Sequence, residues 1–504
     1  MKFLFHFLMI YCSLLSHTVV AQENLLLEEN FETFTEDRLS KGILRKALNL
    51  KADASKRIAV SYDIDPKKWK ESFTLMAWVW AEEDFESYKI IDLSINYPDS
   101  VQLNYQLQKQ MNNAWASEIY SKHAKYEYKP GFKRQLITQG WNLLSLSFNA
   151  QKHEVAFYYN GQQVAIYSLE NFIPKTVPLS IRIQIGGDQK GDLGEWETFN
   201  GMIDDVKLFN YAWNQKNVRQ YYKQLVPSEI IKQNAKPVDS LRIMTYNIWH
   251  GGNETGKGIG YKRIVDIIKQ SKADIIAMQE TYGSGAKIAD ELGYYFYLRS
   301  DNISIMSRYP IEETLPAYKS FHNANVKILI ADRSIVFSSI WLNYPIDYWG
   351  EIDKGIKLDV EKWEIAQDGN KQTMEGIIQS LKPALENSKL IPVIIAGDFN
   401  SGSHLDWISS VRHLNSGYVM PFPTSIYLES MGFRDSFREI FPDPLKTRGL
   451  TWTPINPNTF QDRIDYIYIK SKTVKIINSK IINSHPVKYP SDHAALLTTI
   501  TLTH

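Results

Sequence analysis

Two hydrophobic periods divide this chain, and the change from one to the other limits its fold more than any other feature. From about Asn24 to Tyr222, short runs such as Phe73 to Trp80 and Trp141 to Phe148 alternate in polarity as strands do. After Ser240, apolar strands instead alternate with segments of helical period. We therefore expect an antiparallel β-sandwich followed by an α/β domain.

The segment between these two patterns has the composition of a linker. Residues 226–239 are mostly polar, include two prolines and keep no sustained period. A chain of 504 residues with 44% hydrophobic and 22% charged residues is also too long for one ordinary core. We predict a sandwich over residues 22–225 and an α/β domain over residues 240–504.

Residues 1–21 have the pattern of a secretory signal peptide. A lysine at position 2 precedes an apolar run that is short for a bilayer span, and small residues lead up to Ala21. A retained membrane anchor is the alternative. Removal of the signal would give a mature chain without a transmembrane segment, and we expect it to be secreted, periplasmic or at the cell surface. Cys12, the only cysteine, would leave with the signal, which favours hard-metal oxygen chemistry over thiolate sites.

Polar residues stand at five predicted strand ends of the α/β half. They are Asn247, Glu280, Asp398 with Asn400, Asp465, and Asp492 with His493. Side chains at strand ends can converge on one edge of a sheet, where loops carry function. Hydrolysis of a phosphate ester needs a hard divalent cation, a positioned water with a proton acceptor, and positive charge opposite the phosphoryl oxygens. The ordered set can supply all of these, although each residue alone would more often be an ordinary turn or strand-edge residue.

The residue types indicate separate roles within this set. Glu280, Asn247 and Asp492 offer oxygen ligands to Mg²⁺ or Mn²⁺. Asp398 is placed to orient or deprotonate the attacking water, and Asn400 to hold water or phosphate through its amide.

A histidine provides the remaining charge. His493, when protonated, can donate to a phosphoryl oxygen, and a carboxylate such as Asp465 would favour that form and fix the ring.

The ordered set resembles the endonuclease/exonuclease/phosphatase superfamily, whose members include DNase I. The resemblance implies a four-layer α/β sandwich with a metal-dependent phosphoesterase site, and the same roles for the residues named above. One position departs from the family: Trp341 stands where members commonly carry an active-site histidine. Asn343, His250 or His404 could substitute. All three, together with Trp341, are candidates for contact with substrate, and the two histidines also for a second metal.

The first half resembles the concanavalin-like, laminin-G-like jelly rolls. The resemblance rests on the hairpin from Tyr158 to Val164, on Ile185-Gly-Gly187 and on the closing strand from Gly201 to Phe209. It implies an accessory domain of glycan-binding type. The loop acids Asp188 and Asp192 could hold Ca²⁺, although solvated loops are the commoner explanation.

Charge and motifs together favour a secreted phosphodiesterase acting on a sugar-phosphate or phospholipid-head-group ester, glycan or lipid linked. Lys plus Arg is 57 against 56 for Asp plus Glu, which gives +1 and no sign of the basic stripe of general nucleic-acid binders. A secreted nuclease is one alternative, and a non-catalytic carbohydrate-binding protein with a decayed enzyme domain is another. The aromatic segment from Tyr344 to Trp349 is either a stacking wall for a sugar or base or part of the core.

Overall fold

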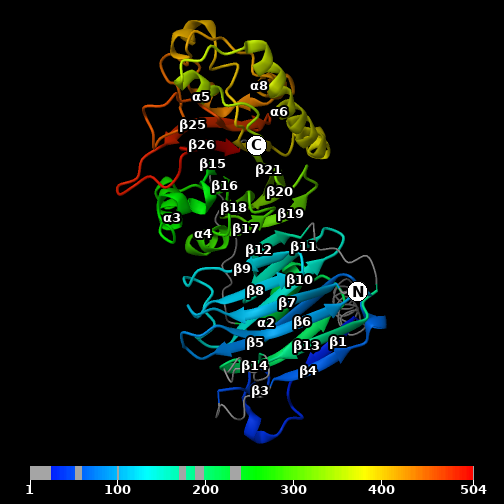
Figure 1. Ribbon diagram of the computed structural model, residues 1–504. Helices are drawn as coiled ribbons and strands as arrows, with labels where there is room; N and C mark the ends of the chain where they lie inside the picture. The colour runs from blue at the N-terminus through cyan, green and yellow to red at the C-terminus, as the bar shows by residue number, and fades with distance from the viewer. Residues whose placement is uncertain are drawn as a thin grey trace, which may run out of the picture. The chain divides into compact units, whose positions relative to one another are not determined.

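The chain forms two compact units, Met1–Ile231 and Lys232–His504 (Figure 1). The computed structural model describes residues 24–51, 59–98, 101–169, 177–187, 198–227 and 240–502. The proposed signal peptide, most of the proposed linker, and Asp188 and Asp192 lie outside the described residues. The domain boundaries drawn from the sequence stay predictions.

The first unit contains two antiparallel sheets. The strand order of one is β2 (Leu39–Lys41), β3 (Lys46–Asn49), β14 (Gly201–Phe209), β5 (Phe73–Ala81), β10 (Asn142–Asn149), β11 (Glu154–Tyr159) and β12 (Gln162–Ser168), with β1 (Leu25–Glu29) paired to β14. The order of the other is β4 (Val60–Ile64), β13 (Ser180–Ile185), β6 (Tyr88–Asn96), β7 (Gln102–Lys109), β8 (Trp115–Tyr120) and β9 (Lys125–Tyr128). Short 3-10 helices η1 (Glu36–Arg38) and η3 (Pro66–Lys68) join strands.

Aromatic side chains fill the space between these sheets. Phe73 of β5 lies edge-on to Tyr105 of β7 with ring centroids 4.8 Å apart, and Tyr128 of β9 stacks on Phe157 of β11 at 4.7 Å. Strand β5 is buried on both faces. One face lies in the core between the sheets, and helix α2 (Gln215–Leu225) covers Met76 and Trp78 on the other. The structure confirms the predicted jelly-roll sandwich.

The second unit contains two mixed sheets. One has the order β17 (Tyr295–Leu298), β18 (Ile303–Ser307), β16 (Ile275–Gln279), β15 (Leu241–Asn247), β26 (Ala495–Leu502) and β25 (Val474–Ile482). The other has the order β19 (Ile311–Leu315), β20 (Asn323–Ile330), β21 (Arg333–Trp341), β22 (Val393–Asp398), β24 (Asp465–Lys470) and β23 (Arg434–Asp435). The β15–β16 and β21–β22 pairs are parallel.

Helices cover the outer faces of both mixed sheets, which gives the predicted four-layer sandwich (Figure 1). On one side lie α3 (Gly260–Ser271) and α4 (Gly285–Leu292); on the other lie α6 (Val360–Ser380) and α8 (Pro423–Ser430), whose Met374 and Leu428 pack on strands β21, β22 and β24. The remaining helices are α5 (Tyr348–Asp353), α7 (Lys382–Glu386), α9 (Ser436–Ile440), η5 (His250–Thr255) and η6 (Ser409–Leu414). No helix in the described part of the chain is long and apolar enough to cross a membrane.

Candidate functional site

The two central strands of the second unit bring their polar ends together from opposite sheets. Asn247 ends β15, and its Nδ2 donates to Asp398 Oδ2, at the end of β22, over 3.0 Å. The same Nδ2 donates to Glu280 Oε1 over 3.1 Å. Glu280 directly follows β16, the parallel neighbour of β15, so both strand ends lie at one edge of the sheet. The convergence expected from the sequence is therefore present in the fold.

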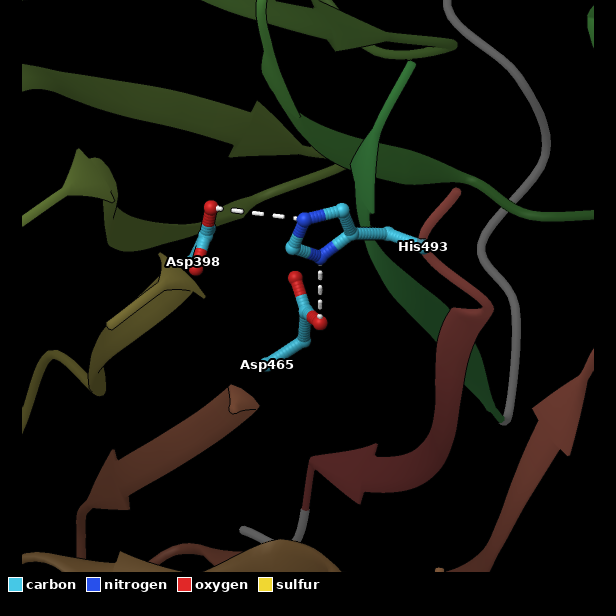
Figure 2. A group of neighbouring side chains, drawn as sticks. All are labelled: Asp398, Asp465 and His493. Atoms are coloured by element: carbon cyan, nitrogen blue, oxygen red, sulfur yellow. Dashed lines mark hydrogen bonds and ion pairs between the residues drawn. The ribbon is translucent and has the colours of Figure 1, made fainter. Parts of the chain in front are cut away.

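His493 lies between two buried carboxylates (Figure 2). Its Nδ1 is 3.0 Å from Asp465 Oδ2, and its Nε2 is 3.9 Å from Asp398 Oδ2. Asp398 and Asp465 are direct partners in the β22–β24 ladder, which places both carboxylates beside the ring. Both aspartates have no exposed surface, and His493 is 5% exposed.

Burial and charge set the protonation of this triad. The pKa of Asp398 is raised to about 7, mainly by burial and also by the neighbouring Asp465, while His493 and the hydrogen bonds from Asn400 and Asn247 oppose the rise. Burial pushes the pKa of His493 down, but Asp465 and Asp398 outweigh this effect and hold that pKa well above its usual value. The ring is therefore an imidazolium that carries positive charge into the site.

A left-handed backbone turn aims Glu280 into the site. Its φ is 55°, and its peptide N–H donates to Asn302 O over 2.7 Å while its carbonyl accepts from Gly251 N over 2.7 Å. Gly251 has a φ of 71°, and a Cβ there would lie 2.7 Å from Ser284 Oγ, so only glycine fits. The His250 peptide N–H then donates to Glu280 Oε2 over 3.1 Å.

The site residues fit a hard divalent cation. Glu280 and Asp492 offer carboxylate oxygens, and burial together with the charge of Glu280 raises the pKa of Asp492. Such mutual repulsion is what a bound Mg²⁺ or Mn²⁺ would relieve. Asn247 fits less simply: its Oδ1 already accepts from Trp249 N over 3.0 Å, and its Nδ2 faces the carboxylates, so one lone pair of Oδ1 remains for a metal.

The side chain of Asn400 is hydrogen-bonded to Leu342 and Asp398. Its Nδ2 donates to Leu342 O over 2.9 Å and to Asp398 Oδ2 over 3.2 Å, and its N–H donates to Asp398 Oδ1 over 2.9 Å. Both amide hydrogens are thus used inside the protein. Asn400 thus positions Asp398, and the expectation that its amide holds water or phosphate stays a prediction.

The two loop histidines lie in different surroundings. His250 belongs to the site, since its Nε2 lies 3.6 Å from Glu280 Oε2. A hydrogen bond from its Nδ1 to Glu254 raises the pKa of His250. His404 instead contacts α8, with Nδ1 2.8 Å from Ser425 Oγ and Nε2 2.8 Å from Glu429 Oε2. No hydrogen bond or ion pair among the described residues joins His404 to the cluster. Helix α8 engages both ring nitrogens of His404, and the expected contact of this residue with substrate or a second metal stays a prediction.

Trp341 and Asn343 lie beside the cluster on the β21 side. Trp341 is the ladder partner of Asp398, and its ring stacks on His322 with centroids 6.0 Å apart. Asn343 is exposed, and its carbonyl accepts from Asn370 Nδ2 over 2.9 Å. Their roles in binding substrate stay predictions.

Two hydroxyl groups that the sequence did not single out hold the cluster in place. Ser491 Oγ donates to Asn247 O over 2.7 Å and accepts from His493 N over 3.1 Å. Thr451 Oγ1 accepts from Asp465 N over 3.2 Å. The only available signal was their position inside the motifs Thr451-Trp-Thr453 and Tyr489-Pro-Ser-Asp-His493.

Comparisons with known proteins agree with this architecture. Residues 244–493 match the model of the Endonuclease/Exonuclease/phosphatase family, and residues 57–219 match that of the Concanavalin A-like lectin/glucanases superfamily. An uncharacterized protein of Caenorhabditis elegans is 28% identical over 293 residues, which is 51% of this chain and 90% of that protein.

Solved structures of low identity also match about half of this chain. Humanized Danio rerio TDP2 is 16% identical, with a TM-score of 0.35, over 52% of this chain and 100% of that one. The human Nocturnin catalytic domain is 15% identical, with a TM-score of 0.36, over 54% of this chain and 97% of that one.

Proposed function

Since residues 244–493 form a domain of the Endonuclease/Exonuclease/phosphatase family, a family of phosphoesterases and nucleases, we propose that this chain is a divalent-metal-dependent phosphodiesterase. One observation carries the proposal: Asn247 Nδ2 joins the carboxylate proposed as metal ligand, Glu280, to the carboxylate proposed as proton acceptor, Asp398, at 3.1 and 3.0 Å. A metal ligand and a base held this close fit attack by a positioned water.

Each residue of the cluster has its own proposed role in catalysis. Asp398, held by Asn247 and Asn400, orients the attacking water and accepts its proton. His493 donates from Nε2 to a phosphoryl oxygen; the 3.9 Å to Asp398 is too long for a hydrogen bond, so this N–H is available for substrate. Asp465 fixes the ring through Nδ1.

Glu280, Asp492 and one lone pair of Asn247 would hold the metal. Mg²⁺ or Mn²⁺ bound there supplies Lewis acidity that withdraws charge from the phosphoryl group. Mg²⁺ usually keeps several waters, so few protein ligands suffice.

We further propose a secreted, periplasmic or cell-surface enzyme whose substrate is a sugar-phosphate or phospholipid-head-group ester. The pattern of residues 1–21 supports export, and the near balance of 57 basic and 56 acidic residues does not favour a nucleic-acid polyanion. The concanavalin-like unit would bind or position a glycan-bearing target, with Ca²⁺ at Asp188 and Asp192 as a further proposal.

A substrate panel on purified protein tests the proposal. It would compare para-nitrophenyl phosphodiesters with monoesters, DNA, RNA and sphingomyelin, each with and without Mg²⁺. Metal-dependent turnover of soluble diesters supports a phosphodiesterase. Preference for DNA or RNA would make the chain a nuclease, and no turnover of any ester would favour a binding protein with a decayed enzyme domain.

A further inference from the structure

A solvent-facing aromatic platform stands next to the candidate site. The ring of Tyr344 is stacked on Trp349 with centroids 5.2 Å apart and an interplanar angle of 4°. Trp349 is only 2% exposed, whereas Tyr344 is 47% exposed. One face of Tyr344 is therefore covered by Trp349, and its exposed surface lies on the other face and the edge.

The platform is tied to the catalytic groups from the Asp398 side. Leu342 N donates to Asp398 O over 2.9 Å, and Leu342 O accepts from Asn400 Nδ2 over 2.9 Å. Tyr344 follows two residues later. The backbone that leads to Tyr344 is thus anchored next to the proposed base.

A second connection reaches the His493 side. The ring of Trp349 contacts that of Trp452 with centroids 5.2 Å apart, and the backbone of Trp452 forms a β-bridge to His493. Tyr344, Trp349 and Trp452 therefore form a row of three rings. The backbone links one end of this row to Asp398, through Leu342, and the other end to His493.

Core packing does not account for the position of Tyr344. Trp349 belongs to a buried aromatic cluster, and Tyr344 lies outside that cluster. The other aromatic residues buried in the cluster are Tyr348, Trp363, Trp407 and Phe422.

Polar contacts fix the platform instead. The hydroxyl of Tyr344 hydrogen-bonds the carboxylate of Asp347, which also accepts from Gly350 N over 2.7 Å. A Cβ on Gly350 would lie 2.2 Å from Asp347 Oδ2, so glycine leaves room for this carboxylate. The exposed ring is thus held in one orientation in advance of any ligand, which lowers the entropy cost of binding.

We propose that Tyr344 is the stacking platform for an uncharged ring of the substrate, a sugar or a nucleobase, joined to the scissile phosphate. This inference rests on the proposed phosphodiesterase function. The carboxylate of Asp347 at the edge of the ring favours hydroxyl or amino donors and repels a further phosphate. The subsite therefore takes a single glycosyl or nucleoside unit.

Two matched diesters isolate the stacking interaction. Bis(para-nitrophenyl) phosphate carries a second ring where methyl para-nitrophenyl phosphate carries a methyl group, and both release the same phenolate. Loss of one stacked ring should raise KM for the ring-bearing diester roughly tenfold in Tyr344→Ala, with kcat unchanged, because the contact is made equally in the ground and transition states. KM for the methyl diester should not change. Tyr344→Phe keeps the flat ring and should behave as wild type, whereas Tyr344→Leu should behave as the alanine variant.

The para-nitrophenyl diesters of glucose phosphate and thymidylate distinguish a stacked sugar from a stacked nucleobase. The one whose KM depends on Tyr344 identifies the unit that stacks, and independence of both would overturn the proposal. Saturation-transfer NMR of bis(para-nitrophenyl) phosphate with chelated protein reports ring contact without turnover. Equal ring saturation in wild type and Tyr344→Ala rejects the platform even where the enzyme is active. A signal lost only in Tyr344→Ala supports it even where hydrolysis is absent.

Discussion

The imidazole of His493 is held by Asp465, whose Oδ2 lies 3.0 Å from Nδ1, while Nε2 stays 3.9 Å from Asp398. One carboxylate therefore fixes and charges the ring, and the other is not hydrogen-bonded to it. Because the two aspartates are paired across β22 and β24, a single ladder sets both distances. The backbone register, more than the side chains, builds the candidate site.

Loss of either partner of this arrangement should remove turnover without unfolding the protein. We expect Asp398→Ala and His493→Ala each to reduce kcat on a soluble diester by at least about a hundredfold, the usual scale for a positioned acid/base or electrostatic group. Steady-state kinetics with circular dichroism measures both effects.

His404→Ala is the matched control, since His404 is also a loop histidine bound to a carboxylate but contacts α8. Its turnover should stay within about twofold of wild type. Wild-type turnover in Asp398→Ala or His493→Ala would remove the proposed catalytic groups.

Hydrolysis should depend on a divalent metal that Glu280 helps to bind. Chelator should abolish hydrolysis, and Mg²⁺ or Mn²⁺ should restore it, because the fitted donors are all oxygen atoms. Glu280→Gln should move the midpoint of a Mg²⁺ titration upward by roughly tenfold or more. Glu429→Gln, an exposed glutamate paired with His404, should leave the midpoint in place. Activity that survives exhaustive chelation contradicts the metal assignment.

Periodicity predicted an antiparallel sandwich and an α/β domain, and strand-end chemistry predicted the gathering of the site; the jelly-roll and four-layer folds were implied by the family resemblances. Alternating apolar residues in the first half and strand-end carboxylates in the second are local signals that the tertiary structure preserves. Periodicity does not locate every helix end: α6 ends at Ser380 and α7 begins at Lys382, with Pro383 in its first turn.

Side-chain direction was beyond such signals. The amide of Asn400 is turned by Leu342 O, and the ring of His404 by Ser425 and Glu429, groups that are 58, 21 and 25 residues away in sequence. None of these three partners can be recognised before the fold is known. Closeness in sequence to Asp398 therefore predicted that both residues lie near the site, but not which partners their side chains bind.

A buried carboxylate in the first unit should make its stability depend on pH. Burial, with the neighbouring Asp205, raises the pKa of Asp204 from 3.8 to about 6. A raised folded-state pKa stabilises the fold at low pH, and this stability is lost as pH rises through about 6. The loss between pH 4 and pH 7 amounts to roughly 2–3 kcal/mol.

Asp204→Asn removes that loss and can keep the hydrogen bond from Leu44 N, which is 3.0 Å long in wild type. We expect the variant to unfold at higher denaturant than wild type at pH 7 and at a similar concentration at pH 4. Asp63→Asn, at an exposed residue paired with Arg182, is the control and should gain no stability at pH 7. A wild-type pH profile in Asp204→Asn would show that this carboxyl is not the cause.

The second unit should work alone on a small substrate. All the proposed metal, water and phosphate positions lie between Asn247 and His493, within the unit Lys232–His504. A fragment starting near Lys236 should therefore fold and hydrolyse a soluble diester about as fast as the full chain, while losing rate only on a large or surface-bound substrate. Limited proteolysis, mass spectrometry and kinetics test this. An insoluble fragment, or a folded one without turnover, would mean that the sandwich is needed to complete the enzyme, and that the division between the units is topological and not functional.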